Sequence, residues 1–590
     1  MSFTRLFDLL PHCLEKFPKS DALAAKEGGK WITYSTKEYL DHSTNLALGL
    51  LSLGIKPGDK IGLIANNRPE WNFADMACLM TGVIDIPIYP TISDHDLEFI
   101  IGDAEISHFF ISDKILFEKV KRCSSKFSFV KNIFCFNKVE GGQHWSELCE
   151  LGNKNPDTTK LEAIKAAIKP NDLATILYTS GTTGNPKGVM LSHDNLISQL
   201  VAVKHLMPTD HRHRALSFLP LNHVYERMLT YNYFSVGTSI YYAESIDTIS
   251  ANLQEVKPHI FTTVPRLLEK VYDRIVAKGT EQTGIKKKLF FWALDLGLRY
   301  EMDGKNGWWY EFQLKIARKL VFSKWKEALG GNLIVSVSGG AALQERLAHV
   351  FWGAGLPVLQ GYGLTETSPV VAVNYLDPGC NRFGTVGPLL DNVQVKFAED
   401  GEILVKGPNV MLGYYKNPVA TAEAITDGWF HTGDIGMLED GKYLKITDRK
   451  KEIFKTSGGK YITPGMIENK LRESPLIEQA MVIGENQKYA SALIVPAFSY
   501  LKDLCTKQNI KYNGNEEMIK SDIVKGWIRE YVDQMNKSLA QYETIKRFEL
   551  LPREWTIDKG ELTPKLSLKR KVILTNCKEL VDKIYGPDIH

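Results

Sequence analysis

Short apolar runs alternate with segments of helical spacing along most of this chain, and this alternation constrains the fold more than any single motif. An apolar run at 61–64 is followed by helical spacing at 71–80 and by a β-branched run at 83–89, which is the pattern of a βαβ unit. The alternation recurs in three later segments, at 108–136, 216–261 and 333–359. Repeated βα units predict parallel sheets covered by helices, with ligands bound at the carboxyl ends of strands.

The pattern changes after Gly384, and the length of 590 residues exceeds the size of a single core. Short alternating runs at 393–397 and 402–405 predict a small antiparallel β subdomain. A polar segment then precedes a region that mixes short strands and helices. We therefore expect a large α/β domain with two βα sheets and the β subdomain, a hinge, and a small α+β domain, at 1–447, 448–452 and 453–590.

Charge and composition limit the classes of function. The 72 basic and 69 acidic residues leave a net charge of +3, which argues against a global basic footprint for nucleic acid. The eight cysteines are scattered without a Cys-x-x-Cys pair, so we expect neither a disulfide framework nor a zinc site. Residues 1–13 lack the apolar core of a signal peptide, and aspartates and prolines interrupt the best apolar run, 74–92. These features predict a cytoplasmic protein, soluble or at most peripheral on the inner face of a membrane.

The segment 178–188 (YTSGTTGNPKG) carries the strongest signal for a ligand site. An apolar run at 173–177 predicts a buried strand before it, and Pro186 with three glycines prevents helix or sheet from continuing. Bare backbone N–H groups, hydroxyls and a mobile lysine are suited to holding a polyphosphate. The candidate ligands are Thr179, Ser180, Gly181, Thr182, Thr183, Gly184 and Lys187. The spacing differs from a Walker P-loop, and a flexible surface turn is the alternative.

Two further loops follow predicted strands. His223 lies in the segment 219–227 (LPLNHVYER), where a histidine is either structural or functional. The segment 338–342 (SGGAA) ends a strand and is expected to open a helix from Leu343 onward. Its small residues would let a flat base approach the backbone at Gly340, Ala341 and Ala342.

A fourth loop is expected at 360–367 (QGYGLTET). The ring of Tyr362, between two glycines, could stack on a base. Thr365 and Glu366 supply oxygen ligands of the kind that Mg²⁺ prefers. A plain turn with an exposed glutamate is the alternative.

The region after Gly384 carries two more candidates. Asp434 could accept hydrogen bonds from a ribose, and Arg449 could donate to a ribose or to a phosphate. The segment 559–570 (KGELTPKLSLKR) is a basic turn near the end of the chain, for which a solvated tail is the alternative.

The segment 285–329 has a different composition, because three lysines stand beside aromatic residues at 286–292 and a further aromatic run follows at 308–310. Such a pattern can lodge at a membrane interface. It is also the pattern of an amphipathic helical insertion that packs on its own protein. The sequence leaves both interpretations open.

Taken in this order, the segments resemble the motifs of the adenylate-forming superfamily of acyl-CoA synthetases, luciferases and peptide-synthetase adenylation domains. The resemblance covers nearly the whole chain. The segment 178–188 resembles the phosphate loop of that superfamily, 360–367 its adenine and magnesium motif, and Asp434 with Arg449 its ribose-binding pair. The segment 427–468, the helical insertion and the closing Leu-Thr-Pro are most similar to long-chain fatty acyl-CoA synthetases.

The resemblance implies the adenylate-forming enzyme fold, with a small mobile C-terminal domain, and the ligation of long-chain fatty acids to coenzyme A with ATP and Mg²⁺. A fatty carboxylate attacks the α-phosphate of ATP, and the thiol of coenzyme A then displaces AMP from the acyl adenylate. The implied catalytic residues are Lys565, Glu366, Thr365 and His223, and the implied metal ligands are Thr183 and Glu366. The implied contacts to ATP and coenzyme A are Thr179, Ser180, Gly181, Thr182, Thr183, Gly184, Lys187, Gly340, Ala341, Ala342, Gln360, Gly361, Tyr362, Gly363, Asp434, Arg449, Lys451, Lys455, Gly458 and Gly459.

Some matches carry particular roles and others depart from the family pattern. Lys451 matches the hinge position, and Lys455, Gly458 and Gly459 match the stretch that lines the pantetheine channel. The closing motif departs, because relatives have a lysine where this chain has Ser567, so the adenylation lysine is Lys565 with Lys569 in reserve. Relatives that gate their acyl tunnel use a tryptophan near His223, where this chain has Arg227, so that gating mechanism is not carried over.

Two other functions compete with this one. A ligase of the same superfamily could load the acyl group onto the phosphopantetheine of a carrier protein. A nucleotide- and fatty-acid-binding protein without catalytic activity could use the segment 285–325 to dock on membranes. The completeness of the nucleotide motifs favours the ligase over the binding protein.

Overall fold

The computed structural model describes residues 3–154, 156–179, 185–245, 247–556, 559–563 and 568–586. Contacts within the chain divide it into a large and a small compact unit. The large unit comprises Met1–Lys396, Leu404–His431 and Leu438–Leu444, and the small unit comprises Phe397–Ile403, Thr432–Met437 and Lys445–His590. The expected hinge at 448–452 stays a prediction.

The first sheet of the large unit has eight strands in the order β15-β14-β13-β12-β10-β11-β1-β2. Their bounds are β15 Val370–Val373, β14 Val358–Gly363, β13 Val335–Ser338, β12 Ile260–Thr263, β10 Arg214–Ser217, β11 Ser239–Tyr242, β1 Leu23–Glu27 and β2 Lys30–Tyr34. Strands β14 to β1 are parallel to their neighbours, and the edge strands β15 and β2 are antiparallel. The loops that follow the parallel strands therefore meet at one edge of the sheet.

The second sheet also has eight strands, in the order β18-β9-β8-β4-β3-β5-β6-β7. Their bounds are β18 Gly413–Tyr414, β9 Lys187–Ser192, β8 Leu173–Thr179, β4 Ile84–Pro87, β3 Lys60–Ile64, β5 His108–Ile111, β6 Asn132–Cys135 and β7 Gln143–His144. Strands β8 to β7 are parallel, whereas β9 is antiparallel to both β8 and β18. The predicted parallel α/β architecture is confirmed.

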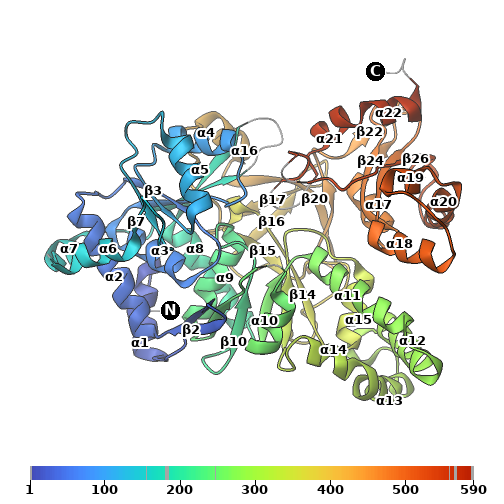
Figure 1. Cartoon of the computed structure of the whole chain (residues 1–590), viewed down its shortest axis with the longest axis horizontal. Helices are drawn as coiled ribbons and strands as arrows, with labels where there is room; N and C mark the ends of the chain where they lie inside the picture. The colour runs from blue at the N-terminus through green and yellow to red at the C-terminus, as the bar shows by residue number, and fades with distance from the viewer. Residues whose placement is uncertain are drawn as a thin grey trace. The chain divides into compact units, whose positions relative to one another are not determined.

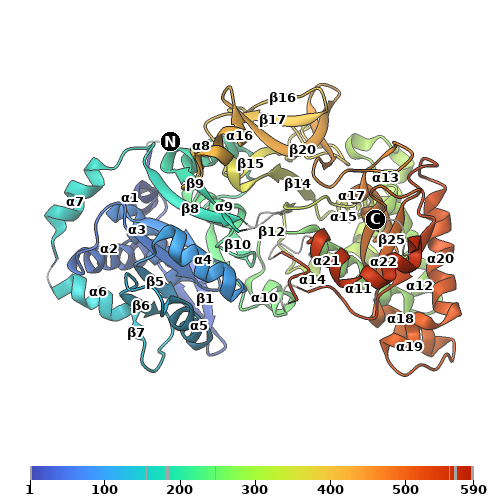
Figure 2. The ribbon, with the colours of Figure 1, turned by 90° about the horizontal axis from the view of Figure 1, so that it is seen from above.

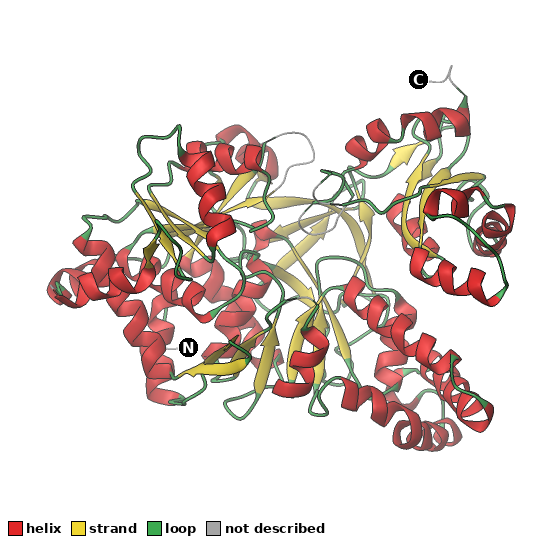
Figure 3. Ribbon diagram, in the orientation of Figure 1, coloured by secondary structure: helices red, strands yellow, loops and turns green. Residues whose placement is uncertain are grey.

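Helices surround the strands of the large unit (Figures 1 and 3). These helices are α1 Leu9–Lys16, α2 Thr36–Ser52, α3 Pro69–Thr81, α4 Asp94–Ala104, α5 Lys114–Ser124, α6 Trp145–Lys154, α7 Thr158–Ala167, α8 His193–Val203, α9 Val224–Ser235, α10 Ile249–Val256, α11 Pro265–Thr280, α15 Glu345–Gly353 and α16 Pro418–Ala424. Every residue of α3 is buried, and so is every residue of α9 except Tyr225. A helix that is buried all round belongs to the interior, so α3 and α9 form part of the core.

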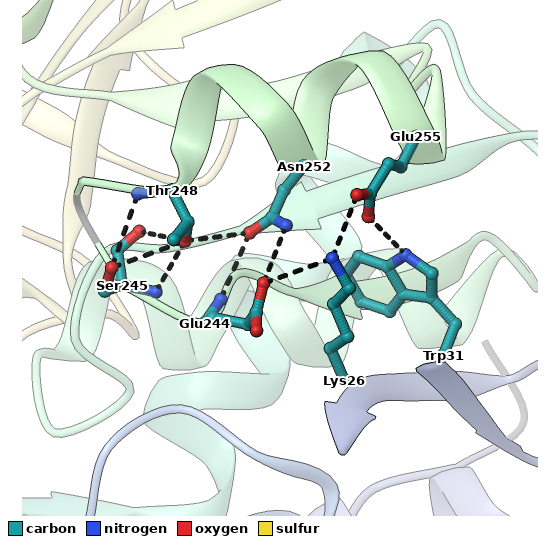
Figure 4. A network of polar contacts seen from close by, with 7 residues as sticks. All are labelled: Lys26, Trp31, Glu244, Ser245, Thr248, Asn252 and Glu255. Atoms are coloured by element: carbon teal, nitrogen blue, oxygen red, sulfur yellow. Dashed lines mark hydrogen bonds and ion pairs between the residues drawn. The ribbon is translucent and has the colours of Figure 1, made fainter. Parts of the chain in front are cut away.

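A polar network joins the edge hairpin β1–β2 to α10 (Figure 4). Lys26 pairs with Glu255 at 2.9 Å, and the indole N–H of Trp31 donates to the other carboxylate oxygen of Glu255 at 2.9 Å. Lys26 also pairs with Glu244, which accepts a hydrogen bond from Asn252. These contacts hold the hairpin against the helix and so help to close one edge of the first sheet.

The segment 285–329 is helical, as expected. It contains α12 Gly284–Leu298, α13 Trp308–Ala317, a π-helical turn at Arg318–Phe322 and α14 Ser323–Ala328. Figures 1 and 2 show these helices grouped near α11 and α15. One face of the group packs into a core cluster of the large unit through residues such as Leu294, Leu314 and Phe322. The insertion therefore does pack on its own protein, although other side chains of α13 do not.

A third sheet lies in the region after Gly384, in the order β16-β17-β20-β19 with β21 paired to β20. Its strands are β16 Gln394–Phe397, β17 Glu402–Lys406, β20 Trp429–Glu439, β19 Ile425–Thr426 and β21 Tyr443–Arg449. β19 and β20 run antiparallel. This sheet corresponds to the β subdomain predicted from the alternating runs.

The rest of the small unit is an α+β structure. Its strands are β22 Phe454–Lys455, β23 Tyr461–Ile462, β24 Ile477–Ile483, β25 Ser491–Pro496 and β26 Arg547–Leu550, and its helices are α17 Pro464–Leu471, α18 Phe498–Lys507, α19 Asn515–Lys520, α20 Asp522–Asn536, α21 Arg570–Asn576 and α22 Lys578–Tyr585. Alternate residues of β25 enter two core clusters, with Ala492 and Ile494 in one and Leu493 and Val495 in the other. Because both faces of the sheet are covered, this unit has a core of its own.

Over the described ranges, no helix combines the length and the apolarity that crossing a membrane requires.

Candidate functional site

The predicted phosphate loop connects two antiparallel strands of the second sheet. Thr179 at the end of β8 pairs with Lys187 at the start of β9. Lys187 and Gly188 were expected in the loop but belong to β9, and Tyr178 and Thr179 belong to β8. The difference arises because strand pairing across the loop continues further than the glycine pattern suggested. Ser180, Gly181, Thr182, Thr183 and Gly184 lie outside the described residues.

A tyrosine on β18 connects the end of this loop to the expected magnesium motif. The ammonium of Lys187 lies 5.0 Å from the ring centroid of Tyr414, and the hydroxyl of Tyr414 donates to Oε1 of Glu366 at 3.0 Å. Burial raises the pKa of the Tyr414 hydroxyl and the Glu366 carboxylate raises it further, so the phenol remains a donor. Tyr414 was not among the predicted site residues, because its place depends on the pairing of β18 with β9 across more than 200 residues.

The motif 360–367 was expected to be a loop, and this expectation is wrong for its first half. Gln360 to Gly363 continue strand β14, which pairs with β15 as well as β13. A Cβ atom on Gly363 would lie 1.8 Å from the carbonyl oxygen of Pro369, so the two strands approach too closely for any other residue. The pairing with β15 could not be read from the local sequence.

The second half of the motif is the single 3₁₀ turn η5 (Thr365–Thr367). The N–H of Leu364 donates to Oγ1 of Thr367 at 2.9 Å, and this hydroxyl donates to the carbonyl of Pro369 at 2.5 Å. Thr365 is buried, whereas Glu366 is only half-buried. The turn therefore fixes the backbone while leaving the Glu366 carboxylate accessible.

The segment 338–342 begins beside this motif. In the parallel register of β13 and β14, Ser338 pairs with Gln360. Gly340, Ala341 and Ala342 follow as exposed residues, and Gly340 has a φ of +81° that favours glycine. The helix α15 begins at Glu345, two residues later than expected, because Leu343 lies in the loop as a buried side chain. The structure thus brings the two predicted base-binding segments together at one edge of the sheet.

His223 lies after β10 of the same sheet and caps helix α9. Its Nδ1 accepts a hydrogen bond from the backbone N–H of Tyr225 at 3.0 Å. A neutral imidazole that accepts at Nδ1 must carry its proton on Nε2, so the cap selects the tautomer.

Arg227 is on the next turn of α9 and belongs to the interior. Its side chain is 1% exposed and pairs with Asp75 at 2.5 Å and with Asp85 at 2.9 Å. It also donates to Oγ1 of Thr175 and to the hydroxyl of Tyr231. Arg227 is therefore held in a buried charge cluster.

In the small unit, the two candidate ribose ligands are adjacent. Nε of Arg449 lies 3.3 Å from Oδ1 of Asp434. Asp434 is buried and its backbone N–H donates to Oγ1 of Thr432, whereas the Arg449 side chain is 57% exposed. Burial raises the pKa of the neighbouring Asp448 to about 6. The pair combines a buried acceptor with a partly exposed donor, which suits a sugar hydroxyl.

The residues matched to the pantetheine channel lie on one hairpin. Lys455 is in β22, opposite Tyr461 of β23, and its ammonium lies 5.3 Å from the Tyr461 ring. Gly458 and Gly459 form the exposed turn between these strands, and Gly459 has a φ of +77°. Lys451, the expected hinge residue, is exposed.

The predicted adenylation lysine, Lys565, lies outside the described residues, together with Ser567. The flanks of its segment are anchored: Leu562 bridges Leu568, and the N–H of Lys569 donates to the carbonyl of Glu561 at 2.8 Å. The following Arg570 holds both oxygens of Glu468 at 2.7 and 2.8 Å. The backbone of Lys569 is therefore anchored to the small unit.

Comparison with known proteins gives matches over the same regions. The family model described as "AMP-binding enzyme" matches residues 10–415, and "AMP-binding enzyme C-terminal domain" matches residues 451–588. The long-chain-fatty-acid–CoA ligase FadD15 of Mycobacterium bovis is 34% identical over 95% of this chain and 93% of its own length. Long chain acyl-CoA synthetase 5 of Arabidopsis thaliana is 30% identical over 98% of this chain and 91% of its own length.

Solved structures share the fold. The adenylation domain of a carboxylate reductase from Mycobacterium chelonae has a TM-score of 0.76 at 21% identity, covering 98% of this chain and 91% of that chain. These matches confirm the predicted fold class and the resemblance inferred from the sequence. The chain belongs to the AMP-binding enzyme family.

Proposed function

We propose that this protein activates long-chain fatty acids to acyl-CoA through an acyl adenylate, with release of AMP and pyrophosphate. The observation that carries the proposal is the convergence of Lys187 and Glu366 on Tyr414, where Lys187 begins the strand that follows the predicted phosphate loop. A cation and a carboxylate held together there suit a polyphosphate and its counter-ion. The identity to long-chain-fatty-acid–CoA ligases over nearly the whole chain supports the same reaction.

The residues present fit a bound Mg²⁺. No cluster of three His, Cys, Asp or Glu side chains exists in the described ranges, so a complete protein cage is absent there. Mg²⁺ is commonly held by one or two carboxylates together with substrate phosphates. Glu366 uses one oxygen to accept from Tyr414 and keeps acceptor capacity for a cation, and Thr183 would assist. Bound there, Mg²⁺ would offset the negative charge of the phosphates.

For the remaining substrates we propose the following contacts. Gly340 to Ala342 and Gln360 to Gly363 would receive the adenine, and Asp434 with Arg449 would hold the ribose. His223, with its proton on Nε2, would donate toward the reacting carboxylate. Lys455, Gly458 and Gly459 would line the channel for coenzyme A. Lys451 would be the hinge residue of a movement that replaces Lys565 with this hairpin between the two half-reactions.

The assignment of Lys565 has its own test. Lys565→Ala should lower the rate of adenylation from acid and ATP by about 10²-fold or more, because it removes a cation from the developing charge. Thioester formation from supplied acyl adenylate should be spared. Lys569→Ala tests the reserve lysine and should keep adenylation near the wild-type rate. Equal loss of both half-reactions in Lys565→Ala would contradict the role of Lys565.

The reaction is tested by product analysis with omitted components. Purified protein is given ATP, Mg²⁺, coenzyme A and acids from acetate to stearate, and AMP and acyl-CoA are measured. The proposal expects both products together for long acids, with none when any component is missing. Turnover only with a carrier protein would favour the carrier-loading ligase, and no turnover would favour the binding protein.

We also propose peripheral contact with a membrane. Long-chain acids partition into lipid, so contact with a bilayer would bring the enzyme to its substrate.

A further inference from the structure

The outer side of α13 is apolar and exposed. Its aromatic face consists of Trp308, Trp309, Phe312 and Ile316 on α13 together with Leu320 on the adjoining π-helical turn, whose exposed fractions are 80, 56, 52, 37 and 49%. The opposite side of the helix is buried through Tyr310, Leu314 and Ala317. A helix on the surface of a globular protein normally turns polar residues outward, so a second apolar stripe requires an explanation.

The aromatic face is a continuous surface. The ring centroids of Trp308 and Trp309 are 5.7 Å apart, and those of Trp309 and Phe312 are 5.6 Å apart in a stacked arrangement. Exposed apolar residues that occur singly need no explanation, but contiguous ones mark an interaction site. Tryptophan is enriched where a protein meets the interface between lipid and water.

The charge around the aromatic face is strongly positive. Residues 284–329 contain ten basic and five acidic side chains, a net charge of +5, in a chain whose total is +3. The other 544 residues therefore carry a net charge of −2. Lys315 and Lys319 are exposed on α13 and the adjoining π-turn. Among the described residues, none of the eight lysines between 286 and 326 has an ion pair, so this charge is not neutralised internally.

We propose that the aromatic face of α13 docks on an anionic lipid bilayer, with Trp308, Trp309 and Phe312 in the headgroup region and Lys315 and Lys319 on lipid phosphates. The proposal rests on the peripheral membrane contact proposed above and assigns its surface and its lipid charge. Aromatic and aliphatic side chains bordered by lysines are the composition of a helix that lies in a membrane interface. A second copy of the chain fits less well, because two faces of net charge +5 would repel each other.

Vesicle flotation of the full-length protein tests this surface. Wild-type protein should float with phosphatidylcholine vesicles that contain about a third phosphatidylglycerol and bind pure phosphatidylcholine much more weakly. The triple substitution Trp308→Ser, Trp309→Ser, Phe312→Ser should reduce binding to the anionic vesicles by about tenfold or more, because the buried apolar area is lost. The matched control, Ile115→Ser with Val419→Ser, changes side chains that are 81% and 68% exposed elsewhere and should bind like wild type.

A charge variant gives an independent result. Lys315→Glu with Lys319→Glu should abolish the preference for anionic vesicles, whereas Lys507→Glu with Lys511→Glu, exposed in the small unit, should keep it. Ligation of a water-soluble medium-chain acid should be unchanged in all variants, which separates a failed docking surface from a failed ligase. Vesicle binding by the triple variant equal to wild type would overturn the proposal. So would a wild-type dimer in light scattering that the triple variant dissociates, since the face would then join two copies.

Discussion

Two groups of charged side chains in the large unit differ in how completely the protein itself satisfies them. Arg227 is fully buried, and it forms ion pairs with the buried carboxylates of Asp75 and Asp85. Glu366 is half-buried, and the Tyr414 hydroxyl occupies only one of its oxygens. A charge that the fold neutralises completely serves stability, whereas a positioned carboxylate with acceptor capacity left over can serve a ligand.

The largest effect is expected for the buried group. Arg227→Met leaves two carboxyl groups in the core without a cation and should destabilise the protein by about 3–5 kcal/mol, read as a lower urea midpoint. Arg212→Met is the control, because Arg212 forms an exposed pair with Asp210 at 2.5 Å and should change stability by less than about 0.5 kcal/mol. Equal midpoints for the two variants would remove the distinction between the groups.

The second effect concerns rate. Glu366→Gln keeps the shape of the side chain but removes its charge, and should lower kcat by about 10²- to 10³-fold through weaker support of Mg²⁺. The urea midpoint should stay at the wild-type value. Glu423→Gln, an exposed substitution on α16, should change neither quantity. A normal rate in Glu366→Gln would mean that Glu366 is only part of an ordinary turn and does not support Mg²⁺.

A third test uses a buried carboxyl that has no cation. Glu226 accepts from Oγ1 of Thr262 at 2.6 Å, and no ion pair reaches it from the rest of the described chain. Burial raises its pKa from 4.5 to about 7. Between these values the folded protein keeps a proton that the unfolded chain releases, so stability should fall as pH rises.

Glu226→Gln should remove this contribution, which amounts to about 1.4 kcal/mol per pH unit. Urea midpoints measured from pH 4.5 to 7 would show a flatter dependence in Glu226→Gln than in wild type or Glu423→Gln. An unchanged slope would mean that Glu226 is ionised in the folded protein.

The sequence predicted the strands and the order of the motifs, because apolar runs and small residues are local signals. It did not predict where the motifs stop being loops. Pairing with β15 makes Gly361 to Gly363 part of β14, and pairing with β8 makes Lys187 part of β9. The role of Arg227 was also hidden, since Asp75 and Asp85 lie about 150 residues away in sequence.

The smallest effect is expected for the single hydroxyl that contacts Glu366. Tyr414→Phe keeps the ring near Lys187 but removes the donor to Glu366, which should lower the apparent affinity for Mg²⁺ or kcat by about tenfold. Tyr500→Phe, exposed on α18, is the matched control. An effect as large as that of Glu366→Gln would contradict the account, because the Glu366 carboxylate would then depend entirely on the Tyr414 hydroxyl.

The most direct test of the account is fatty-acid-dependent exchange of pyrophosphate into ATP, measured without coenzyme A and followed by its addition. The account predicts exchange that requires a long-chain acid and Mg²⁺, and stoichiometric acyl-CoA once coenzyme A is added. Absence of exchange with every acid, or exchange that never yields acyl-CoA, would contradict it.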